Sequence, residues 1–239
     1  MNNLKKMKFS ILIVLGFVLI FAFVTTLSSG KVSLLSENDS STQKVVSSKF
    51  EKFTLSELKH DDIEFINQFS NEFKVDNRLI FALIKQESQF DKEALSDRGA
   101  VGLMQIMPAT NLEVNEELHI ENAPLLKGHL RAGIYYFSKL LNLFKNGSSD
   151  DRLRLALAAY NAGPSRIYDA QELVAYLNEN PNSWTSIRNA LPLLSKRYYS
   201  LHQSVWEGGK PKNGYFRSSR QTIMFVENIM RIYGEFRKG

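Results

Sequence analysis

The sequence predicts an all-α domain that follows an N-terminal membrane helix, and three observations lead to this prediction. From about residue 55 onward apolar residues recur with helical spacing, and no stretch alternates with the period of two that is typical of a strand. An uncharged apolar run of 19 residues, 9–27, forms a helix of roughly 28 Å, close to the thickness of a bilayer core. The chain contains no cysteine, which excludes disulfide scaffolds, cysteine nucleophiles, thiolate metal sites and an N-terminal lipid on cysteine.

Length and charge narrow the class of protein further. The 239 residues have room for one membrane segment and one domain of ordinary size, and the 44% hydrophobic and 23% charged residues are normal for a globular protein. The net charge is +5, but residues 31–239 carry 27 Lys+Arg against 25 Asp+Glu, a net charge of only +2. A nucleic-acid-binding protein needs a larger surplus, so we exclude that class.

The N-terminal region is interpreted as a membrane anchor or an uncleaved signal. Residues 1–8 form a basic cytoplasmic segment, because Lys5, Lys6 and Lys8 precede the apolar run 9–27 and no matching cluster follows it. In the alternative interpretation, cleavage near 28–30 releases a secreted protein. A flexible Ser-rich tether, 28–54, then leads to the domain at 55–239, which lies in the periplasm or outside the cell in either case.

The helices of the domain are predicted from apolar spacing and from end signals. Asp76, Asp150 and Ser183 are predicted N-caps, while Gly147 and Gly163-Pro164 are stop signals. Residues 195–219 read as a long irregular insertion that contains Trp206, which either caps the core or binds a partner. The predicted helices cover 61–73, 77–88, 102–107, 125–144, 151–160, 165–178, 184–191 and 221–236.

Nucleotide and metal chemistry are not expected, and no cofactor is predicted. The chain has no Gly-rich phosphate loop, no Gly-x-Ser-x-Gly elbow and no His-Glu-x-x-His helix. The four histidines are scattered at no ligand spacing, so each is interpreted as a surface or packing residue. They are His60, His119, His129 and His202.

One acid stands out, Glu87 in the last turn of the predicted helix 77–88. It shares a helical face with Ile80, Leu83 and Ile84, at i, i+3, i+4 and i+7. Desolvation on such a face raises the pKa of a carboxyl, and a carboxylic acid that is still protonated near neutral pH can act as a general acid. The alternative is that Glu87 lies in solvent at a frayed helix end.

The segment after this helix contains a second unusual pattern. A polar loop ends at Gly99 and Gly102, and the apolar segment 103–107 encloses a single amide, Gln105. A buried amide needs hydrogen-bond partners, so packing alone does not explain this residue.

Together these segments resemble the lytic transglycosylase family, whose members have the goose-type lysozyme-like fold and cleave bacterial peptidoglycan. ALIKQESQF at 82–90 with GAVGLMQIMPAT at 99–110 is similar to the first family motif, and LALAAYNAGP at 155–164 to the second. Shorter matches at 182–184, 191–195, 198–200 and 225–229 are similar to the catalytic domain of membrane-bound F-type members. The resemblance covers roughly residues 60–236.

The resemblance implies which residues form the site. Glu87 matches the single general acid and base. Ser96, Met104, Gln105 and Met107 match positions in or beside the glycan cleft. Tyr160 matches the tyrosine whose hydroxyl approaches the catalytic carboxyl, and Asn161 matches its neighbour in the cleft wall. Two positions depart from the family pattern near the last helix, Gln221 in place of Glu and Phe225 in place of Tyr, and these put the polarity of the cleft in doubt.

The reaction that the resemblance implies is non-hydrolytic cleavage of the β-1,4 bond between N-acetylmuramic acid and N-acetylglucosamine, which leaves 1,6-anhydromuramoyl ends. One alternative is a hydrolytic muramidase, which needs a second carboxylate about 5–9.5 Å from the first. The other is a non-catalytic peptidoglycan-binding module, although the intact Glu87-Ser88 and Tyr160-Asn161 pairs argue against it. The expected partners are glycan strands and, through 9–27, the membrane.

Overall fold

The structure is a computed structural model that describes residues 58–119 and 125–238. The predicted basic segment, membrane helix and tether all lie outside the described residues. Within those residues, no helix is both long and apolar enough to span a membrane. All regular elements of the described residues are helices, and the only β-structure among them is two isolated bridges, Leu95 with Val101 and Val101 with Ile106. The all-α prediction is therefore confirmed.

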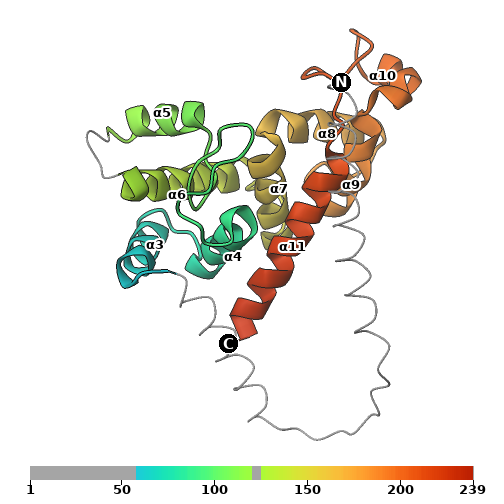
Figure 1. Cartoon of the computed structure of the whole chain (residues 1–239). Coiled ribbons are helices and arrows are strands. Elements are labelled where there is room, and N and C mark those ends of the chain that lie inside the picture. The colour runs from blue at the N-terminus through green and yellow to red at the C-terminus, as the bar shows by residue number, and fades with distance from the viewer. Residues whose placement is uncertain (1–57, 120–124, 239) are drawn as a thin grey trace, which may run out of the picture. The chain divides into compact units, whose positions relative to one another are not determined.

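Eleven helical segments follow one another in the described part of the chain (Figure 1). Nine are α-helices or short α-helical turns, and two are 3₁₀ turns. In order they are α3 (His60–Glu72), α4 (Asn77–Ser88), α5 (Pro108–Glu117), α6 (Leu125–Leu143), α7 (Ser149–Ala162), α8 (Pro164–Tyr176), α9 (Trp184–Ala190), η1 (Leu191–Leu194), η2 (Lys196–Tyr198), α10 (Tyr199–Val205) and α11 (Ser219–Lys238).

Helix α7 is the centre of the domain. Five successive residues, Leu155 to Ala159, have no exposed surface, which occurs only when a helix is covered on every side. The covering helices are α6, α8, α9 and α11, all of which contact α7 (Figure 1). The C-terminal end of α7, which carries Tyr160 and Asn161, is therefore fixed by the core.

Helix α11 packs against both α4 and α7 and so connects the helix that carries Glu87 to the central helix of the domain (Figure 1). Its Tyr233 hydroxyl donates to Asp76 Oδ2 at 2.9 Å, and Asp76 also caps α4 by accepting from the Arg78 amide. The predicted N-cap at Asp76 is confirmed. For α7 the structure places the cap at Ser148, whose hydroxyl accepts from the Asp151 amide, so the predicted cap at Asp150 is wrong.

The predicted helix at 102–107 is wrong, and a helix that was not predicted follows it. Residues 101–106 form a turn held by two backbone hydrogen bonds between Val101 and Ile106, and Gly102 and Gln105 have positive φ angles. The apolar residues of this segment, Leu103, Met104 and Ile106, are buried by the fold of this turn and not by one face of a helix. Helix α5 begins at Pro108, a favoured first helical residue, but Val114 is its only buried side chain, so it has no apolar periodicity to recognise.

The segment 195–219 is more regular than predicted, since it contains η2 and α10. Trp206 at its centre is 6% exposed and donates from Nε1 to Glu172 Oε2 of α8 at 2.6 Å. It belongs to the buried core of the domain, which agrees with the core-capping alternative.

Candidate active site

The Glu87 carboxyl lies in the last turn of α4, on the face that packs into the core. Ile80, Leu83 and Ile84 on the same face have no exposed surface, as the spacing predicts. The helix ends directly after it, because Gln89 and Phe90 both adopt left-handed backbone conformations. Glu87 is half-buried, so it does not fray into solvent.

Burial raises the pKa of Glu87 from 4.5 to about 8. Desolvation is the only cause of this shift, and no neighbouring charge raises or lowers the pKa. Among residues 58–119 and 125–238, the carboxyl has no hydrogen-bond or ion-pair partner. The group is therefore mostly protonated at neutral pH and free to donate its proton to a bound molecule.

The loop 91–107 follows this helix end and is held by its own hydrogen bonds. The Gly102 amide donates to Ala94 O at 2.9 Å, and the Ser96 amide donates to Ala100 O at 3.0 Å. At its base Lys92 forms an ion pair with the buried Asp62 of α3. The loop is thus a folded unit that is anchored to the helical domain.

Gln105 and Ser96 both hold this loop together. Gln105 Nε2 donates to Ala94 O and Gly102 O, at 2.9 and 3.0 Å, which uses both amide hydrogens inside the loop. Ser96 Oγ accepts from the Ala100 amide at 2.9 Å. These contacts are the partners that an enclosed amide requires, and the glycan contacts of the two residues stay predictions.

Tyr160 connects α7 to the loop. Its hydroxyl donates to Met104 O at 2.7 Å, and its ring packs against Tyr136 and Phe137 of α6, with centroids 5.8 and 6.0 Å apart. Burial raises the pKa of Tyr160 well above 10, and the negative charge of Glu87 raises it further. The hydroxyl is close enough to Glu87 to interact with its charge, but its hydrogen bond goes to the loop backbone.

Asn161 connects α7 to α11. Its Oδ1 accepts from Thr222 Oγ1 at 2.8 Å, and Thr222 has no exposed surface. The two residues that depart from the family pattern lie on the same helix, α11. Gln221 is exposed, whereas Phe225 is 7% exposed and belongs to the core.

The side chain of Met104 packs directly against helix α6, at a position where glycine leaves room for it. Met104 is 2% exposed, and a Cβ atom added at Gly133 of α6 would lie 2.7 Å from its sulfur. Only glycine at 133 leaves this space. Met107, by contrast, is 42% exposed at the start of α5.

The structure therefore links three predicted site residues, Glu87, Tyr160 and Met104, through burial, charge and a hydrogen bond. Sequence patterns did not indicate Gly133, Tyr136 or Thr222, because their roles depend on contacts between distant helices. The Gly-x-Tyr-Tyr run at 133–136 offers a weak signal at most.

One histidine, His129, lies near the loop of the candidate site: a Cβ atom added at Gly102 would lie 3.7 Å from its Nδ1. His202 is fully buried elsewhere in the domain, with its Nε2 2.7 Å from Leu193 O. His60, Asp61 and Glu64 bring potential metal-ligand atoms within 4.8 Å of one another at the start of α3, where all three are exposed. Exposed acidic groups commonly occur together without an ion, so this group indicates no metal site.

The helical fold and this arrangement place the domain in the lysozyme-like class. The 70-kDa soluble lytic transglycosylase of Escherichia coli superposes with a TM-score of 0.50 over 73% of this chain and 24% of that chain, and the 19% identity makes this a likeness of fold.

The chain belongs to the Transglycosylase SLT domain family, whose model matches residues 64–183. Two curated relatives are each named membrane-bound lytic murein transglycosylase F. The protein of Desulfosudis oleivorans is 34% identical over 160 residues, which are 66% of this chain and 32% of the relative. The protein of Erwinia tasmaniensis is 34% identical over 162 residues, which are 66% of this chain and 30% of the relative. The chain thus spans about a third of the length of these relatives, and the family predicted from its motifs is confirmed.

The raised pKa of Glu87 predicts a pH-dependent gain in stability for Glu87→Gln. Between pH 4.5 and about 8 the unfolded chain loses the Glu87 proton while the folded chain keeps it, so this group lowers the free energy of unfolding as pH rises. The variant should match the parent protein near pH 4. Above pH 5 it should become more stable by up to about 1.4 kcal/mol per pH unit, reaching a few kcal/mol at pH 8. Urea denaturation at several pH values measures this difference, and a constant difference across the range would contradict it.

The Gly133–Met104 contact predicts that Gly133→Ala destabilises the domain. The added methyl overlaps the Met104 sulfur, and overpacking of this kind costs about 1–3 kcal/mol. Gly234→Ala in α11 is a matched control, because a Cβ atom there has no neighbour within 4 Å and alanine favours a helix. Denaturant unfolding should show Gly133→Ala below and Gly234→Ala at or above the parent protein. Equal losses in both variants would refute the role of the contact.

Proposed function

We propose that this protein is a peptidoglycan lytic transglycosylase in which Glu87 acts first as general acid and then as general base. The observation that carries the proposal is the half-buried Glu87 carboxyl, whose pKa desolvation raises to about 8 and no charged neighbour shifts. Family membership supports the substrate class, since the relatives are named for murein.

In the proposed first step, Glu87 donates its proton to the glycosidic oxygen between N-acetylmuramic acid and N-acetylglucosamine. The bond from C1 to that oxygen breaks, and the acetamido carbonyl of the muramoyl residue stabilises the positive charge at C1. The protonated carboxyl required here is the form that burial favours near pH 7.

In the second step the Glu87 carboxylate accepts the proton of the muramoyl 6-hydroxyl. The 6-oxygen then bonds to C1, which closes the 1,6-anhydro ring without consuming water. Glu87 returns to its protonated state. The hydrogen bond from Tyr160 to Met104 O holds the loop against α7 during both steps.

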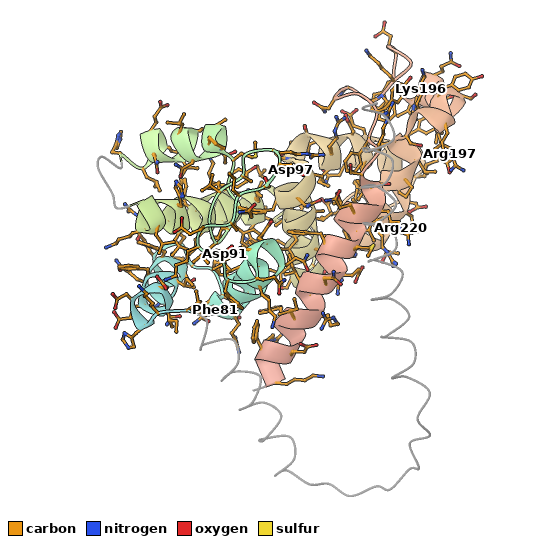
Figure 2. All side chains as sticks on the ribbon, in the orientation of Figure 1. Phe81, Asp91, Asp97, Lys196, Arg197 and Arg220 are labelled. Carbon is orange, nitrogen blue, oxygen red and sulfur yellow. The ribbon has the colours of Figure 1, made fainter. Side chains whose placement is uncertain are left out.

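A single carboxylate is favoured over the two of a hydrolytic muramidase. A second acid within about 5–9.5 Å of the first would act on its charge, and no such effect contributes to the pKa of Glu87. Asp91, Glu93 and Asp97 are the acids of the adjoining loop, and all three are exposed (Figure 2 labels Asp91 and Asp97).

The proposal extends to the location of the protein. The apolar run 9–27 anchors the chain in the membrane with its N-terminus in the cytoplasm, and the domain acts on the wall in the periplasm or outside the cell. The relatives named as membrane-bound support this location.

The products released from purified peptidoglycan by residues 31–239 test the proposed reaction. Mass spectrometry should detect muropeptides lighter by one water than ordinary reducing-end muropeptides, and Glu87→Gln should release none because the amide has no acidic proton to donate. Hydrated ends would instead identify a muramidase. A folded parent protein that binds glycan but releases no product would favour the non-catalytic module.

A further inference from the structure

The second half of the domain carries an unusual concentration of positive charge. Residues 188–226 contain seven Lys and Arg but only one acid, Glu207, whereas residues 31–239 as a whole have a net charge of +2. Two of the seven cations have acidic partners, since Arg188 lies 3.9 Å from Glu227 and Lys212 pairs with Glu172. The remaining charge is not neutralised within the described residues.

Four of these cations form what we call the basic patch, Lys196, Arg197, Arg217 and Arg220. All four are exposed, and none has a hydrogen bond or ion pair in the described part of the chain. Arg197 lies over the ring of Tyr198, with its guanidinium carbon 5.0 Å from the ring centroid. Unpaired guanidinium groups of this kind are suited to bidentate binding of carboxylates.

Backbone contacts bring the two parts of the basic patch together. The Phe216 amide donates to Leu194 O at 3.1 Å, so the chain before Arg217 lies beside the chain before Lys196. The turn η1 also contacts α11, whose first turn carries Arg220. Figure 2 shows Lys196, Arg197 and Arg220 on the same side of the domain, around the start of α11.

The same end of α11 borders the candidate active site. Thr222, two residues after Arg220, donates its hydroxyl to Asn161 at 2.8 Å, and Asn161 directly follows Tyr160. A ligand that extends from the site by one short peptide would therefore reach the basic patch. A peptide of three to five residues spans roughly 10–17 Å when extended.

We infer that the basic patch binds the carboxylates of the stem peptides that the muramoyl residues of peptidoglycan carry. This inference rests on the proposed function, because it assumes that a glycan strand occupies the site. Stem peptides carry several free carboxylates and are attached to the sugar that would lie beside Glu87. The basic patch lies at the end of α11 that contacts Asn161, and this position favours the stem peptides over anionic lipid headgroups.

The test compares intact peptidoglycan strands with strands from which an amidase has removed the peptides. The parent protein should have a lower KM for the peptide-bearing strands. Arg217→Gln with Arg220→Gln should raise that KM about three- to tenfold and leave the KM for stripped strands unchanged. A second double variant, Lys196→Gln with Arg197→Gln, removes the two charges of the other segment and should act in the same direction.

Lys145→Gln with Lys238→Gln is the matched control, since both residues are exposed and the change in charge is the same. Equal KM values for both substrates in the parent protein and all variants would overturn the inference while the proposed function stands. Absence of cleavage of either substrate by the parent protein would instead refute the proposed function. Loss of sedimentation with phosphatidylglycerol vesicles in the patch variants, with equal KM values, would assign the basic patch to lipid and overturn the inference.

Discussion

Desolvation of the Glu87 carboxyl is the constraint on which the rest of the site depends. A carboxyl in water ionises near pH 4.5, and this one stays protonated to about pH 8 because it is partly buried on the aliphatic face of α4. Keeping the acid there lowers the stability of the fold above pH 5, so the surrounding core must offset that cost. The fully buried run in α7 fixes the position of Tyr160, whose hydroxyl is close enough to feel the charge of Glu87.

Three contacts connect this buried core to the residues around Glu87. The Tyr160 hydroxyl binds Met104 O, the Met104 side chain fills the space above Gly133, and Asn161 accepts from Thr222. Together they join the loop, α6, α7 and α11 around one end of α4. The residues that hold the loop also include Gln105, whose amide hydrogens bind two backbone carbonyls. Much of the polar chemistry in the motif therefore shapes the backbone, and the Glu87 carboxyl, which has no such partner among the described residues, is the group that we propose to react.

The sequence predicted α4 with its bounds correct, because the Asp76 cap and the apolar positions 80, 83 and 84 act locally. The same reasoning failed at 102–107, where the buried side chains belong to a turn with Gln105 at a φ of 46°. Helix α5 was missed because it buries only Val114. The importance of Gly133 and the assembly of the basic patch depend on contacts between segments that are distant in the sequence. Periodicity within one helix carries no information on such contacts.

The pKa of the Glu87 carboxyl can be measured directly in the folded protein. The carboxyl carbon can be followed by ¹³C NMR across a pH titration and assigned as the resonance that Glu87→Gln removes. We expect a titration midpoint of about 8 in the folded, unliganded protein. A midpoint near 4.5 would mean that the carboxyl is solvated and ionised at neutral pH, and it would contradict the role of Glu87 as a proton donor held ready by burial.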